Sequence, residues 1–187
     1  DYDHIKEVDV VAIMIGTPVD GEGNARLDDL FNFVDNTLIP RMKKHQLIVL
    51  RSTVSPGTTE VIAKHIQKEH RWTEGIDYFL VFCPERVVQG KSILETTKLP
   101  QLVGASNDFS FNAAKDFFKT FITNEIFRLT PREAEIGKLM TNMYRYVTFA
   151  FANEFWMIGE KHGINIDKVI EACNRSEEHT SELQSHH

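Results

Sequence analysis

The sequence predicts an α/β fold in which a mostly parallel sheet is followed by one long helix. Short apolar segments rich in β-branched residues alternate with helical segments along residues 1–129. This alternation is typical of crossover connections between parallel strands. After the last strand, residues 130–163 carry apolar side chains at helical spacing. We therefore expect one sheet domain in residues 1–129, and the long helix with the start of an all-α domain in residues 130–174.

Five segments have the composition of strands. The first is apolar except for Asp9, which indicates a strand buried on both faces of the sheet. The predicted strands are Val8–Ile15, Leu47–Leu50, Tyr78–Phe82, Leu102–Gly104 and Ile126–Leu129.

Three shorter helices lie between these strands. The first is expected from Asp28, as its cap, to about Met42, with Pro40 ending or kinking it. In the second, Ser55 is expected to be the N-cap of a helix that reaches His70. The third covers residues 108–121.

The long helix has clear start and stop signals. Thr130, Pro131 and Glu133 form a capping box with proline at the first helical position, and Gly163 suits a left-handed stop. The helix would be about 45 Å long. Between residues 144 and 158 it is apolar nearly all round, so we expect a second domain or the same helix of another subunit to cover it.

Composition excludes several classes of protein. The 187 residues have a net charge of −6 and no basic run, which argues against nucleic acid and anionic membranes. No apolar segment approaches the roughly 20 residues that span a bilayer, and no signal peptide opens the chain, so the cytoplasm is the default location. Cys83 and Cys173 are expected to be reduced thiols. Neither the cysteines nor the histidines have metal-ligand spacing, so no metal is expected.

The ends of the first three strands are expected to form one crevice. In open parallel sheets, ligands bind beyond the carboxyl ends of the strands, which here carry residues 16–18, Ser52-Thr53 and Pro84-Glu85. A dinucleotide-binding sheet would also need a Gly-x-Gly-x-x-Gly turn, but Gly21-Glu22-Gly23 lacks the third glycine. Either the fold binds another ligand, or it is an incomplete doubly wound, Rossmann-like sheet whose first βαβ unit lies upstream of Asp1.

Both ends of the sequence suggest a piece of a longer protein. The chain starts at Asp1 rather than Met, almost directly before a strand. Residues 175–187 are polar and match the peptide produced when a common sequencing adapter is translated, so we expect a non-native tail.

Several short motifs follow one another along the chain. In chain order they are Gly16-Thr17-Pro18, Ser52–Thr59, Cys83-Pro84-Glu85-Arg86 with Gly90, Leu99–Gly104, Lys138-x-x-x-Asn142, Asn153-Glu154 and Gly163-Ile164-Asn165. Together these motifs resemble the nucleotide-sugar 6-dehydrogenases, the UDP-glucose/GDP-mannose dehydrogenase family. The Cys-Pro-Glu-Arg form and the Leu-Pro-Gln stretch are most similar to its UDP-N-acetylmannosamine branch.

The resemblance implies an NAD-dependent oxidation of a UDP-sugar. Such enzymes convert the C6 alcohol to a carboxylate with two NAD⁺, through an aldehyde held as a thiohemiacetal and then a thioester on a cysteine. Glu85 would act through water in thioester hydrolysis, helped by Thr53, in a dry crevice that raises its pKa. Lys138 and Asn142 lie four residues apart on one helical face and would stabilise the oxyanion.

The resemblance also implies binding roles and one absence. Thr17, Pro18 and Thr53 would contact NAD, while Arg86 and Val87 would join Glu85, Lys138 and Asn142 at the substrate. Gln89 stands where many relatives have a second glutamate. The family's nucleophilic cysteine lies beyond the long helix in a Gly-rich segment, which neither Cys83 nor Cys173 matches.

The missing cysteine predicts an inactive fragment, and an unprotected sheet edge predicts poor solubility or domain swapping in isolation. The apolar long helix predicts a homodimer with this helix as the contact. Two other functions stay open. A β-hydroxyacid dehydrogenase also carries a Lys-x-x-x-Asn helix, but it would perform a single oxidation. A non-catalytic module would use the long helix only for dimerisation.

Overall fold

The computed structural model describes residues 2–22, 24–85 and 99–174. The chain divides into two compact units, residues 1–138 and 139–187, which we describe separately. The longest helix, α5 (Pro131–His162), begins in the first unit and continues into the second. The predicted α/β class is confirmed.

The first unit is built on a five-stranded sheet with strand order β1-β2-β3-β4-β5. β1 pairs with β2, β2 with β3, and β4 with β5 in parallel, whereas β3 and β4 are antiparallel. The sheet is therefore mostly parallel, as predicted. The strands are β1 (Val10–Ile13), β2 (Leu47–Leu50), β3 (Phe79–Phe82), β4 (Gln101–Ala105) and β5 (Ile126–Leu129).

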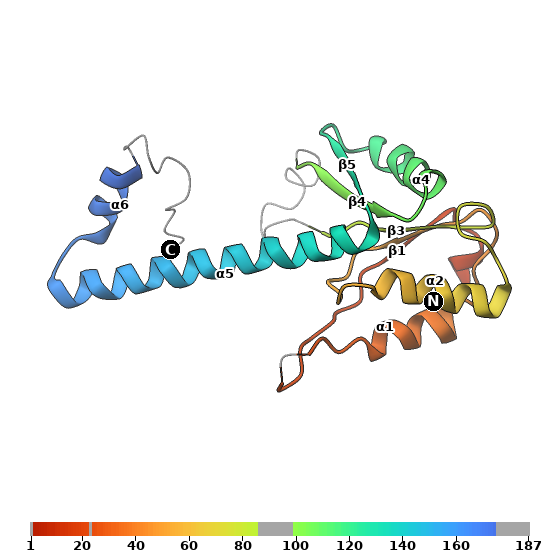
Figure 1. The fold of residues 1–187 in the computed structure, drawn as a ribbon, viewed down its shortest axis with the longest axis horizontal. Coiled ribbons are helices and arrows are strands. Elements are labelled where there is room, and N and C mark those ends of the chain that lie inside the picture. The colour runs from red at the N-terminus through yellow and green to blue at the C-terminus, as the bar shows by residue number, and fades with distance from the viewer. Residues whose placement is uncertain (1, 23, 86–98, 175–187) are drawn as a thin grey trace. The chain divides into compact units, whose positions relative to one another are not determined.

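Helices cover both faces of this sheet (Figure 1). One face packs against α1 (Asp28–Phe33), the following π-helical turn η2 (Val34–Leu38) and α2 (Thr58–His70), and the other packs against α4 (Asp108–Lys119). Successive side chains of a strand point to opposite faces, so Ile48 and Leu50 join the first core while Leu47 and Val49 join the second. All four are buried, which explains why the β2 sequence is apolar without alternation.

β1 differs from its prediction as a strand buried on both faces. It is shorter than expected, Ala12 is exposed, and Met14 just beyond it is 64% exposed. The physical reason is its position, because β1 pairs only with β2 and lies at the edge of the described sheet. Its open edge leaves backbone hydrogen-bonding groups available for pairing.

Two helix starts were predicted wrongly. Asp28 is the first residue of α1 rather than its cap, and Leu27 holds the N-cap position without a side-chain hydrogen bond. α2 starts at Thr58, so Ser55 is not its N-cap; the N-cap is Gly57 in a left-handed conformation with φ +95°. Ser55 accepts a hydrogen bond from the Thr58 hydroxyl instead (2.7 Å), in the turn that precedes the helix.

The capping box of α5 is confirmed. The backbone N–H of Thr130 donates to the Glu133 carboxylate (2.7 Å), and the N–H of Glu133 donates to the Thr130 hydroxyl (3.3 Å). The hydrogen bonds from Thr130 lower the pKa of Glu133. At the other end, Gly163 has φ +63°, the expected left-handed stop.

The second unit consists of most of α5 and of α6 (Ile166–Asn174). Along α5, many large apolar side chains are exposed in the single chain. We expected such an apolar surface on a helix that a second domain or another subunit covers. Examples between 39% and 69% exposed are Met143, Tyr144, Tyr146, Val147, Phe149, Phe151, Phe155, Trp156, Met157 and Ile158. No helix in the described part of the chain is long and apolar enough to cross a membrane.

Candidate active site

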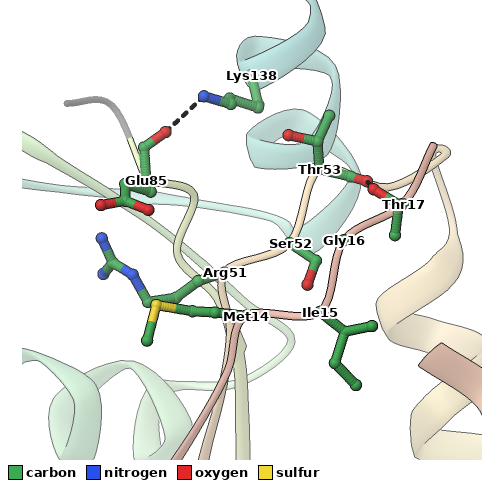
Figure 2. Close-up of a pocket in the computed structure, with 9 residues that line it drawn as sticks. All are labelled: Met14, Ile15, Gly16, Thr17, Arg51, Ser52, Thr53, Glu85 and Lys138. Atoms are coloured by element: carbon green, nitrogen blue, oxygen red, sulfur yellow. Dashed lines mark hydrogen bonds between the residues drawn. The ribbon is translucent and has the colours of Figure 1, made fainter. Parts of the chain in front are cut away.

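A cavity of about 310 Å³ lies at the carboxyl ends of β1, β2 and β3. The predicted crevice is thus confirmed, because it brings together the three strand ends and the start of α5. Figure 2 shows Thr17 and Thr53 on one side and Glu85 and Arg51 on the other, with Lys138 above. The lining residues are Met14, Ile15, Gly16, Thr17, Arg51, Ser52, Thr53, Glu85 and Lys138.

Two of the three residues predicted to contact the cofactor, Thr17 and Thr53, line the cavity, whereas Pro18 does not. The Thr17 hydroxyl donates a hydrogen bond to the backbone carbonyl of Thr53, which joins the loops after β1 and β2. Both threonines are half-buried and line the cavity. Pro18 does not line it, and its carbonyl accepts a hydrogen bond from the N–H of Arg26 (2.8 Å).

The Ser52 hydroxyl is the feature that best tests whether a cofactor fits here. Ser52 is only 6% exposed, and its Oγ is the buried side-chain oxygen that has no hydrogen-bond partner among the described residues. A buried hydroxyl without a partner costs free energy unless a bound group satisfies it. Ser52, together with the two threonine loops, therefore fits the polar end of a cofactor.

Glu85 lies three residues after the end of β3 and is exposed, so the dry crevice that we expected around it is not found. The carboxylate lies on the same side of the cavity as the Arg51 guanidinium (Figure 2).

Arg51 is a lining residue that the sequence did not single out. Its Nη1 lies 3.9 Å from the Cys83 sulfur, and its guanidinium lies 5.9 Å from the centre of the Phe118 ring. Its place at the end of β2, directly before Ser52, is the signal that could have identified it. Arg51 and Lys138 give the cavity two cations against the single carboxylate of Glu85, so the site favours an anionic group.

Cys83 packs in the core beside this site. It is buried, and its thiol donates to the amide oxygen of Gln101 (3.5 Å). Burial raises the pKa of the thiol to about 12, although the neighbouring Arg51 acts in the opposite direction. A thiol that stays protonated is a poor nucleophile. Cys173 is exposed on α6.

Lys138 reaches the cavity from the second turn of α5. Its ammonium donates a hydrogen bond to the backbone carbonyl of Glu85 at 2.5 Å (Figure 2). The contact joins residues 53 positions apart and holds a cation at the end of β3. A half-buried ammonium at this position can stabilise a negative charge that develops in the cavity.

Asn142, the remaining predicted site residue that the structure describes, does not line this cavity. Asn142 follows Lys138 by one helical turn but belongs to the second unit, where its amide oxygen accepts a hydrogen bond from Arg145 (2.8 Å). Its convergence with Lys138 on one oxygen stays a prediction. Arg86, Val87 and Gln89 lie outside the described residues.

Comparison with protein families identifies the class to which this site belongs. Residues 1–122 match the NAD-binding domain of the UDP-glucose/GDP-mannose dehydrogenase family, and residues 132–185 match its central domain. The chain therefore belongs to the UDP-glucose/GDP-mannose dehydrogenase family. Its first unit is a domain that binds NAD.

Individual relatives agree with this assignment. The chain is 34% identical over 173 residues to the UDP-N-acetyl-D-mannosamine dehydrogenase of Methanocaldococcus jannaschii. The aligned part covers 91% of this chain and 39% of the relative. The solved structure of UDP-D-ManNAc dehydrogenase from Pyrococcus horikoshii superposes with a TM-score of 0.89 at 28% identity, over 99% of this chain and 43% of that one. The solved structure of a UDP-N-acetyl-mannosamine dehydrogenase from Staphylococcus aureus superposes with a TM-score of 0.76 at 32% identity. This superposition covers 90% of this chain and 41% of that one. The chain thus spans about two fifths of the length of these relatives.

Proposed function

We propose that this chain carries part of the active site of an NAD-dependent dehydrogenase that oxidises C6 of UDP-N-acetylmannosamine to a uronic acid. The observation that carries the proposal is the meeting of Thr17, Thr53, Glu85 and Lys138 around one cavity. The names of the relatives support the substrate, and the cytoplasm is the compartment that we propose.

Five of the lining residues have a chemical role in this proposal. Thr17, Ser52 and Thr53 hold the cofactor, and bound NAD⁺ supplies the hydride acceptor. The Lys138 ammonium stabilises the alkoxide as the C6 hydroxyl loses its proton, with Asn142 as the second donor. Glu85, with Thr53, accepts a proton from the water that hydrolyses the acyl intermediate. Arg86 and Val87 contact the sugar.

We propose further that residues 1–187 do not turn over alone. The relatives are more than twice as long, and the nucleophile of a four-electron oxidation is a thiolate, which the buried and protonated Cys83 does not provide. A cysteine outside residues 1–174 would supply it.

Substitution of Lys138 tests the proposed chemistry. In the complete enzyme, Lys138→Ala should lower kcat by about 100-fold or more, the usual loss when one oxyanion donor is removed. Its KM for NAD⁺ should not change, because we assign Lys138 to the substrate and Thr17, Ser52 and Thr53 to the cofactor. Lys68→Ala, on the exposed surface of α2, is the matched control and should leave kcat unchanged. Full activity of Lys138→Ala would refute the proposed role and would favour a non-catalytic module.

We also propose that a second copy of the protein covers the exposed apolar surface of α5 between residues 143 and 158. The support is the number of large side chains that remain exposed there, since such a continuous apolar surface is unusual for a monomer. A two-fold axis would place the same surface of each copy against the other.

Sedimentation tests this homodimer. Phe151 is 47% exposed and packs against the ring of Phe155, with ring centres 4.6 Å apart. Phe151→Glu should shift the complete enzyme from dimer to monomer, because a charge would be buried in the contact. Gln67→Glu adds the same charge to the exposed surface of α2 and should leave the dimer intact. A wild-type monomer would contradict the proposal.

A further inference from the structure

Glu135 is a fully buried carboxylate in the second turn of α5. Glu135 is 0% exposed, and no other acidic or basic side chain among the described residues is buried. A carboxylate in the interior is unfavourable unless hydrogen bonds compensate its loss of solvent. The partners of Glu135 therefore show why a charge stands at this position.

Three donors surround the Glu135 carboxylate. The N–H of Gly57 donates at 2.5 Å, the N–H of Thr59 at 2.9 Å and the Thr59 hydroxyl at 2.6 Å. Both oxygens are engaged, Oε2 by Gly57 and Oε1 by Thr59. We call this set the Glu135 contacts.

The two amides belong to the start of α2, which has no cap of its own. Gly57 is the N-cap residue and carries no side chain that could accept a hydrogen bond. Glu135 accepts from the first amides of that helix in place of a local Ser, Thr or Asp. The positive end of the α2 dipole also favours a carboxylate there. One side chain thus caps a helix that lies more than 70 residues earlier in the chain.

The Glu135 contacts join two segments that each carry a residue lining the cavity. Lys138 follows Glu135 by three residues on the same helix, so a shift at Glu135 moves the ammonium. Thr53 precedes Gly57 in the loop that ends at the α2 amides. The carboxylate therefore fixes the separation between the segment that carries Lys138 and the loop that carries Thr53.

Other contacts in the first unit show that this part of α5 is closely packed. Arg132 forms an ion pair with Glu60 on the same α2–α5 interface (2.7 Å), at the surface. Ala134 is fully buried, and its Cβ lies close to Gly104 of β4. The ion pair is exposed and contributes little, which leaves the buried Glu135 contacts as the polar connection between the two helices.

We propose that Glu135 is a positioning residue for the oxidation, which holds the Lys138 ammonium at a fixed place relative to Thr53 through the start of α2. The role in the reaction rests on the proposed function above, whereas the Glu135 contacts themselves do not. The two parts can therefore be tested separately.

The first test measures the position of Lys138 in this chain without any reaction. The amine is labelled with a small acylating reagent, and the rate at Lys138 is read by mass spectrometry. Glu135→Gln removes the charge, and Thr59→Val removes only the hydroxyl donor while keeping the shape of the side chain. Both should raise the labelling rate at Lys138 about threefold or more relative to wild type, because α5 is then held less firmly. Glu60→Gln, which removes an exposed carboxylate from the same interface, should not.

Equal labelling of Lys138 in wild type and in folded Thr59→Val would overturn the proposal. If Glu135→Gln does not fold, Thr59→Val still tests the role of the Glu135 contacts. Thr59→Val leaves the Glu135 carboxylate and both of its amide contacts in place.

The second test measures catalysis in the complete enzyme. Thr59→Val should lower kcat by about tenfold or more with an unchanged KM for NAD⁺, since small displacements of a catalytic group are costly. Thr59→Ser restores the hydroxyl and should recover the wild-type kcat, which a loss due only to altered packing would not do. A wild-type kcat in Thr59→Val would refute the positioning role. Failure of the wild-type enzyme to reduce NAD⁺ would instead refute the proposed function, and the labelling test would still decide the Glu135 contacts.

Discussion

Replacement of Gly104 by alanine should destabilise the first unit because the first turn of α5 packs directly on this residue. A Cβ at position 104 would lie 2.8 Å from the Cβ of Ala134, 2.9 Å from the Cα of Pro131 and 3.0 Å from the carbonyl oxygen of Thr130. Carbon atoms in contact are ordinarily about 3.5 Å or more apart. The helix would therefore have to move by roughly 0.7 Å, and two of the three atoms are backbone, so no rotamer change can relieve the overlap.

The size of the effect follows from two opposing terms. Overpacking a well-filled site costs about 1–3 kcal/mol, while removing a glycine from a strand gains about 0.5–1 kcal/mol. The expected net loss in the free energy of unfolding is about 1–2 kcal/mol. Gly137→Ala is the matched control, because its Cβ would meet only the Cδ1 of Leu102, at an ordinary 3.6 Å. Gly137 lies within α5, so alanine there should add about 1 kcal/mol through helix propensity.

Urea unfolding of the chain, followed by circular dichroism, measures both variants. The midpoint should fall for Gly104→Ala and rise for Gly137→Ala, with the slope unchanged. If Gly104→Ala were as stable as wild type, the close packing of α5 on β4 would be refuted. The positions that we derive for Glu135 and Lys138 would then lose their support.

Two further predictions concern titratable groups in the first unit. Iodoacetamide at pH 8 should label exposed Cys173 and leave Cys83 unmodified in the native chain, since burial raises the pKa of Cys83 to about 12; rapid labelling of Cys83 would contradict its burial. Burial also raises the pKa of Glu74, although Ser106 and Ser110 donate hydrogen bonds to it. A raised pKa means that the folded chain binds the Glu74 proton more tightly than the unfolded chain does. The stability that protonated Glu74 contributes is therefore present below the pKa of Glu74 in the unfolded state, and it is lost as the pH rises through the pKa of Glu74 in the folded state. Glu74→Gln should therefore raise the midpoint of urea unfolding at pH 7 but not at pH 4. An equal change of the midpoint at both pH values would refute the raised pKa of Glu74.

The sequence predicted those parts of the fold that depend on neighbouring residues. The capping box of Thr130 and Glu133, the left-handed Gly163 and the five strands all follow from local patterns. The cavity could be predicted because the carboxyl ends of β1, β2 and β3 lie at one edge of a parallel sheet.

The features that the sequence missed depend on distant partners. Glu135 looks like an ordinary helical glutamate until the fold brings Gly57 and Thr59 to it from more than 70 residues away. The same contacts explain the wrong cap for α2, because the acceptor for its first amides does not precede the helix. The exposure of Ala12 reflects the edge position of β1, which its composition does not reveal.

The number of NADH molecules formed per UDP-sugar tests the central claim most directly. The complete enzyme, given limiting UDP-N-acetylmannosamine and excess NAD⁺, is followed by absorbance until the reaction ends, and the product is identified by mass spectrometry. A four-electron oxidation around Glu85 and Lys138 predicts two NADH per sugar and a uronic acid. One NADH per sugar with an aldehyde or ketone product would contradict it and would support a single-step dehydrogenase.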